Sequence, residues 1–183
     1  MKKYSVIFCL IAVLVFASFS GCTGQNSGGG SDTISGDTVT ILEEILSGAD
    51  AQLSDPDKLP GSFTDPVTAD NSQGMIGLTP AQFDKYVEDA YASTGMIITF
   101  AHEIALVKCN DIAAAAEVKK LIAEGFDSNK WICAFPDASL VIDSGSYVLL
   151  AVGNKNAVQA VAESFSNIAD GNVGEINIFF GQV

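Results

Sequence analysis

The stretch EIALVKCNDIAAAAEVKKLIAEG, residues 103–125, decides the fold because a strand pattern gives way to a helix pattern within it. Glu103 to Cys109 is apolar at successive positions, which predicts a strand buried on both faces. Asp111 is a typical helix-capping residue, and the apolar residues that follow it recur at helical spacing until Gly125. The stretch therefore predicts a strand followed directly by an amphipathic helix over Ile112 to Glu124.

The chain after this unit repeats the same kinds of element. Two β-like runs, Ala138 to Ile142 and Tyr147 to Val152, flank the turn signal Asp143-Ser144-Gly145-Ser146. A helix is expected from Asn156 to Ile168, and a last strand from Glu175 to Phe180. The order strand, helix, strand, strand, helix, strand predicts a ferredoxin-like α+β fold, with two helices on one face of an antiparallel sheet.

The chain before this unit predicts an extra edge strand and two N-terminal helices. Spacing indicates one helix from Val39 to about Leu46, and Thr79-Pro80 begins a second that extends to Tyr91. Met96 to Phe100 is the expected edge strand, and residues 49–77 are expected to form a long loop. Because the core strands are apolar on both faces, the sheet face without helices needs a cover. The N-terminal region is one candidate, and a partner or second copy is the other.

The amino end has the pattern of a lipoprotein signal. Met1-Lys2-Lys3 is followed by an apolar run from Val6 to Ala17 and by Ser20-Gly21-Cys22. We therefore expect a signal peptide over 1–21, lipid on Cys22, a flexible Gly/Ser-rich tether over 22–38 and one α+β domain over 39–183. That places the protein at the cell membrane, on the extracytoplasmic face. An ordinary secretory signal and an uncleaved anchor are the alternatives, since Phe19 stands where leucine is usual.

The remaining cysteines are expected to stay reduced. Cys9 lies within the signal, which leaves Cys109 and Cys133 in the domain. In the predicted topology these two residues lie at opposite ends of the sheet, too far apart for a disulfide. We therefore expect two free and mostly buried thiols.

The charge of the chain excludes one class of partner. Its 183 residues include nine lysines and no arginine, against 22 acidic residues, for a net charge of −13. Such a surface repels phosphate, so nucleic-acid binding is not expected. The interactions still expected are attachment to the membrane through lipid on Cys22 and binding of a protein or small-molecule ligand.

No residue pattern indicates a catalytic centre, a metal site or a cofactor. His102, the only histidine, is expected to be a turn residue between two strands, with Glu103 on the opposite side of the sheet. His102, Cys109 and Cys133 lack the close spacing of metal ligands. The carboxylates of the long loop are expected to form a solvated acidic surface. The alternative function is a hydrolase that uses these carboxylates for catalysis. They are Asp50, Asp55, Asp57, Asp65 and Asp70.

The chain resembles the small prokaryotic lipoproteins of the domain of unknown function 4358 family, over roughly Gln82 to Ile168. The resemblance lies in the lipidated amino end with its spacer and in two apolar motifs, Glu103 to Lys108 and Gly145 to Leu150. It implies a lipid-anchored cell-envelope protein and brings no catalytic residue. We accordingly expect a non-catalytic binding or interaction module outside the membrane.

Overall fold

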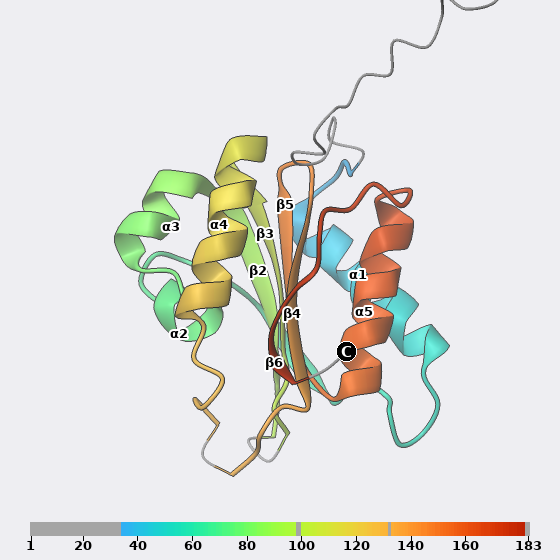
Figure 1. Ribbon diagram of the computed structural model, residues 1–183. Helices are drawn as coiled ribbons and strands as arrows, with labels where there is room; N and C mark the ends of the chain where they lie inside the picture. Colours follow the sequence, from blue (N-terminus) through green and yellow to red (C-terminus); the bar gives the residue numbers. More distant parts are fainter. Residues whose placement is uncertain (1–33, 98–99, 132, 182–183) are drawn as a thin grey trace, which may run out of the picture.

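The computed structural model describes residues 34–97, 100–131 and 133–181, and it contains five helices and six strands in these ranges (Figure 1). The predicted signal peptide and Cys22 lie outside the described residues. In chain order the elements are α1 Thr38–Gln52, β1 Ser62–Pro66, α2 Ser72–Ile76, α3 Pro80–Tyr86, β2 Val87–Gly95, β3 Glu103–Cys109, α4 Ile112–Gly125, β4 Ala138–Ser144, β5 Tyr147–Gly153, α5 Lys155–Ile168 and β6 Asn177–Gly181.

The strands form one antiparallel sheet in the order β1-β2-β3-β5-β4-β6. This confirms the expected α+β class with an antiparallel sheet. The turn between β4 and β5 is also confirmed, because Ser144 pairs with Tyr147 across a two-residue loop. Gly145 opens that loop with a φ of 56°, a conformation that glycine adopts without steric cost.

The position of β6 differs from the ferredoxin-like expectation. In that fold the last strand lies beside the first strand of the repeat, whereas here β6 pairs with β4 and β2 lies beside β3. The connection from β5 to β6 therefore runs in the same direction along the sheet as that from β3 to β4, although β5 is antiparallel to β3. Since such crossovers are right-handed, α4 and α5 must lie on opposite faces. The expected pair of helices on one face is thus wrong.

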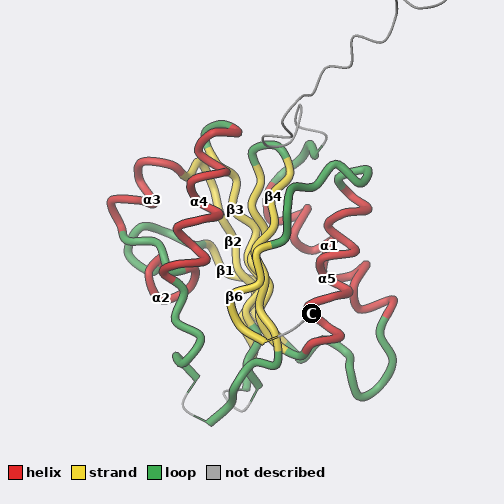
Figure 2. Tube along the Cα trace, viewed as in Figure 1, coloured by secondary structure: helices red, strands yellow, loops and turns green. Residues whose placement is uncertain are grey.

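Both faces of the sheet are covered by the protein's own helices, with α1 and α5 on one side and α2, α3 and α4 on the other (Figures 1 and 2). Alternate residues of each central strand enter different cores. In β5, for example, Leu149 packs with α5 and Leu150 packs with α4. The N-terminal region contributes to both covers, because α1 joins one core and Ile76 the other.

The second N-terminal helix is shorter than expected. The capping box at Thr79 and Gln82 begins α3 as predicted, but the helix ends at Tyr86 and the chain continues as β2. Pairing of β2 with both β1 and β3 outweighs the helical spacing of its apolar residues. Met96, Ile97 and Phe100 lie in the connection to β3, not in a strand, and the predicted loop over 49–77 contains β1 and α2.

Candidate binding site

A cavity of about 620 Å³ lies at the end of the sheet where β4 begins and β5 ends. Four segments that are distant in sequence line it: the loop from α1 to β1, residues 96–97 and 100–102 between β2 and β3, residues 134–137 before β4, and the junction of β5 with α5. Figure 1 shows these connections at the bottom, whereas the blue segment that leads into α1, where the described chain begins, lies at the top. A cavity of this size is within the range of small-molecule sites.

The walls carry large apolar side chains that face solvent. The exposed fractions are 55% for Met96, 57% for Ile97, 57% for Phe100 and 73% for Phe135. These four are half of the eight exposed large apolar residues in the described part of the chain. Soluble proteins seldom gather such residues on one concave surface without a ligand or partner. This set was not predicted from the sequence, although Phe100 and Phe135, two large apolar residues in segments that also contain turn residues, were an available signal.

His102 forms part of the cavity wall and is only 3% exposed. It lies in the connection between two strands as expected, and its side chain is buried there. Its Nε2 atom lies 3.3 Å from the hydroxyl of Ser93, and Ser93 donates a hydrogen bond of 2.8 Å to Ser62. This chain of contacts holds the imidazole ring against β2, in the wall of the cavity.

Burial lowers the pKa of His102 from 6.5 to about 4, which makes unfolding dependent on pH. Between pH 6.5 and pH 4 the unfolded chain binds a proton that the folded protein does not, so the free energy of unfolding should fall as the pH falls. A shift of this size corresponds to about 3 kcal/mol. The free energy of unfolding, measured with urea, should fall between pH 7 and pH 4 in both proteins. The fall should be about 3 kcal/mol smaller for His102→Gln than for wild type. An NMR titration of this single histidine that gives a pKa near 6.5 would contradict the prediction.

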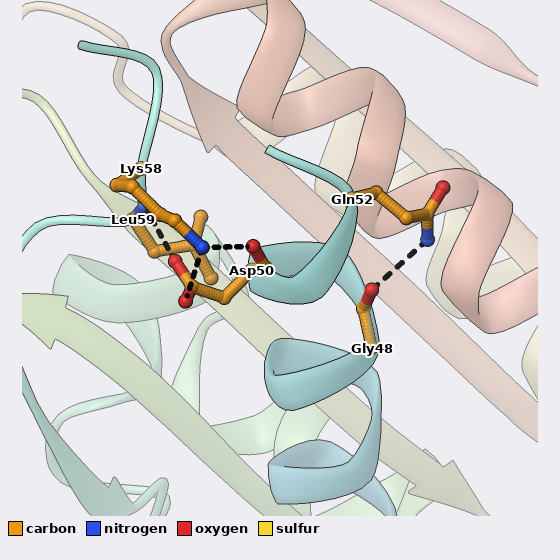
Figure 3. A network of polar contacts seen from close by, with 5 residues as sticks. All are labelled: Gly48, Asp50, Gln52, Lys58 and Leu59. Atoms are coloured by element: carbon orange, nitrogen blue, oxygen red, sulfur yellow. Dashed lines mark hydrogen bonds and ion pairs between the residues drawn. The ribbon is translucent and has the colours of Figure 1, made fainter. Parts of the chain in front are cut away.

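Polar contacts hold the loop that forms one wall of the cavity. Lys58 donates to the carboxylate of Asp50 at 3.0 Å, and the backbone N–H of Leu59 donates to the same carboxylate at 3.2 Å (Figure 3). On the other side, the amide of Asn156 donates to Asp57 at 2.8 Å. The loop is therefore attached to the end of α1 and to the first turn of α5.

The acidic residues of the predicted loop do not gather into one centre. Asp50 binds Lys58 and Asp57 binds Asn156, whereas Asp65 belongs to β1 and faces a different hollow. Asp55 and Asp70 are exposed. Within the described residues, no group of three or more His, Cys, Asp or Glu side chains could hold a metal ion. The arrangement therefore offers no support for a hydrolase that uses these carboxylates.

Glu103 faces the opposite side of the sheet from His102, as expected, and lines a second hollow of about 460 Å³. Its buried carboxylate accepts a hydrogen bond of 2.8 Å from Lys130. Burial raises the pKa of Glu103, and the Lys130 ammonium partly opposes this shift. Lys130 also lies over the rings of Phe126 and Trp131 and donates to the carbonyl of Gly74. These contacts join α2, β3 and the segment after α4.

The two cysteines of the domain are free, but they differ in exposure. Cys109 is buried at the end of β3, where burial raises its thiol pKa to about 12. Cys133 is exposed, which corrects the expectation that both are mostly buried. Cys133 lies in the connection before β4, outside both cores. An apolar residue in such a connection need not be buried.

The exposure of the cysteines predicts their reactivity. Only a deprotonated and accessible thiol is nucleophilic, so iodoacetamide at pH 8 should modify Cys133 and leave Cys109 unmodified in the folded protein. In urea both residues should react. Peptide mapping by mass spectrometry assigns the label to each cysteine, and Cys133→Ser serves as the control. Rapid modification of Cys109 without denaturant would contradict the prediction.

No protein-family model, curated protein or solved structure matches this chain. The resemblance to small prokaryotic lipoproteins therefore stays a prediction. Among the helices of the described ranges, none combines the length and the apolar character needed to cross a bilayer.

Proposed function

We propose that this chain is a non-catalytic binding protein, anchored by lipid on Cys22 to the extracytoplasmic face of the cell membrane, and that the cavity accepts a ligand with an apolar body. The observation that carries the binding function is the concentration of exposed Met96, Ile97, Phe100 and Phe135 around one cavity. Burying each of these side chains under a ligand would contribute free energy in proportion to the apolar area removed from water.

The place of the cavity in the fold suits a membrane-anchored protein. The described chain begins at the end of the sheet opposite the cavity (Figure 1). An anchor at Cys22, 12 residues before Ile34, would leave the cavity at the far end of the domain. The signal pattern over 1–21 and the resemblance to small prokaryotic lipoproteins support this anchoring.

The cavity function can be tested with 1-octanol as a neutral probe. Full-length protein in phospholipid nanodiscs would carry ¹³C-methyl methionine, and empty nanodiscs would correct for octanol dissolved in lipid. Met96 lines the cavity, whereas Met75 lines only the second hollow and is an internal reference. We expect a saturable shift of the Met96 signal with no change at Met75.

A matched pair of variants separates the cavity from exposed apolar surface in general. Ile97→Ser should weaken octanol binding about tenfold, because it removes apolar contact worth about 1.4 kcal/mol. Ile112 is also exposed but lies outside the cavity, so Ile112→Ser should leave the affinity unchanged. A Met96 signal that shows no saturable response, or equal losses in both variants, would contradict the binding function.

Anchoring is tested separately by Cys22→Ala. We expect labelled fatty acid on the wild type and its absence from the variant, which should leave the membrane fraction with an unchanged circular-dichroism spectrum. If the wild type carries no lipid and both proteins are found in membranes, an uncleaved anchor replaces this proposal. If both are released without lipid, an ordinary secretory signal does.

A further inference from the structure

The cavity contains one buried polar group with an unused hydrogen-bonding position. His102 is 3% exposed, and its Nε2 atom contacts Ser93, but its Nδ1 atom has no hydrogen-bond partner among the described residues. Every fully enclosed polar side-chain atom in those residues does have a partner. The Nδ1 atom is therefore not fully enclosed, and of the hollows described above only the cavity has His102 in its lining.

The contacts of Ser93 bear on whether Nδ1 of His102 donates or accepts a hydrogen bond. A serine hydroxyl has one hydrogen, and Ser93 donates it to Ser62. With the hydroxyl hydrogens arranged in this way, the contact between Ser93 and His102 uses a hydrogen on Nε2. If Ser62 donated to Ser93 and Ser93 donated to Nε2, the hydrogen of the neutral ring would lie on Nδ1 instead. In the first arrangement Nδ1 carries no hydrogen and is an acceptor, and the ¹⁵N signals of His102 in the free protein distinguish this arrangement from the second. The lowered pKa of His102 keeps the ring neutral above about pH 4.

We propose that the cavity binds a neutral molecule with an apolar body and one hydroxyl or amide N–H group, and that His102 Nδ1 accepts the hydrogen bond from that group. This inference rests on the proposed binding function and names its ligand class. An anionic ligand does not fit, because Nδ1 offers no hydrogen and the carboxylates of Asp57 and Asp137 lie at the cavity. The charged groups lining the cavity are these two and Lys58, which is paired with Asp50.

Two isomeric probes separate the hydrogen bond from the apolar contact. 1-Octanol and methyl heptyl ether have the same number of non-hydrogen atoms, but only the alcohol is a donor. In the nanodisc assay, wild type should bind octanol about tenfold more tightly than the ether, as one additional buried hydrogen bond provides. With ¹⁵N-labelled histidine, octanol should shift the Nδ1 signal of His102 while the ether leaves it unchanged.

A variant then tests the residue itself. His102→Leu fills the space of the imidazole with an apolar side chain that cannot accept a hydrogen bond. The variant should lose the preference for octanol, and its affinity for the ether should change less than twofold. Equal binding of both probes to wild type, together with weakening of both by Ile97→Ser, would overturn the role of His102 but retain the binding cavity. Absence of any saturable Met96 shift would overturn both proposals. The wild-type comparison decides the matter even if His102→Leu does not fold.

Discussion

Replacing Lys119 by methionine is expected to lower the free energy of unfolding by about 3–5 kcal/mol. Lys119 projects from α4 onto β4, and its ammonium lies 2.7 Å from the carboxylate of Asp143, with only 11% and 8% of the two side chains exposed. The same ammonium donates to the backbone carbonyl of Glu175, near the start of β6. Methionine would leave the Asp143 carboxylate buried without its cation. An uncompensated buried charge destabilises the folded state strongly.

An exposed ion pair provides the control for this prediction. Lys108 lies 2.8 Å from Glu88, but 31% and 53% of these side chains are exposed. Lys108→Met should therefore cost less than about 1 kcal/mol in the same urea unfolding experiment. Adding Asp143→Asn to Lys119→Met should recover part of the loss, because the buried charge is then removed. An equal loss of unfolding free energy in Lys119→Met and Lys108→Met would contradict the prediction that the buried ion pair matters more than the exposed one.

The second large effect is expected for Gly77→Ala, at about 2–5 kcal/mol. Gly77 ends α2 with a φ of 79°, which disfavours any residue with a Cβ atom. An added Cβ would also collide with the backbone of Gly125 and Phe126 at the end of α4. The close approach of these two helix ends leaves no flexible side chain that could move aside.

Two other glycines separate the causes of this effect. Gly171 has a φ of 75° but no atom within 4 Å of an added Cβ, so Gly171→Ala should lose only about 1 kcal/mol from backbone strain. Gly74 lies inside α2 with open space around it, and Gly74→Ala should be neutral or stabilise by up to about 1 kcal/mol. Thermal unfolding of the three variants should rank them in this order, and a Gly77→Ala loss no larger than that of Gly171→Ala would exclude the collision.

The sequence predicted the elements after residue 103 well because each carries its own local signal. The apolar run of β3, the Asp111 cap of α4 and the Gly145 turn all appear where expected. The region before residue 103 was predicted less well. β1 is a polar edge strand that ends at Pro66, and it exists through pairing with β2 rather than through its own composition. Strand order is likewise a property of long-range pairing, which is why the position of β6 was not predicted.

The candidate site was predicted least. Alternation along a strand correctly placed His102 and Glu103 on opposite faces, since that rule needs only adjacent residues. The cavity itself depends on four connections that meet only after the sheet has formed. Sequence periodicity describes helices and strands, and it carries no information on how such connections approach one another.

The packing of α1 beside α5 imposes an order on how the chain can fold. These helices share one core, although about 100 residues separate them along the chain. During synthesis the apolar face of α1, formed by Ile41, Leu42, Ile45 and Ala49, has no native partner on α5 until that helix, Lys155–Ile168, is being made. The opposite core draws all of its residues from a shorter span, between Val67 and Val152. Contacts of low sequence separation form first, so we expect the α4 side of the sheet to assemble before the α1 side closes.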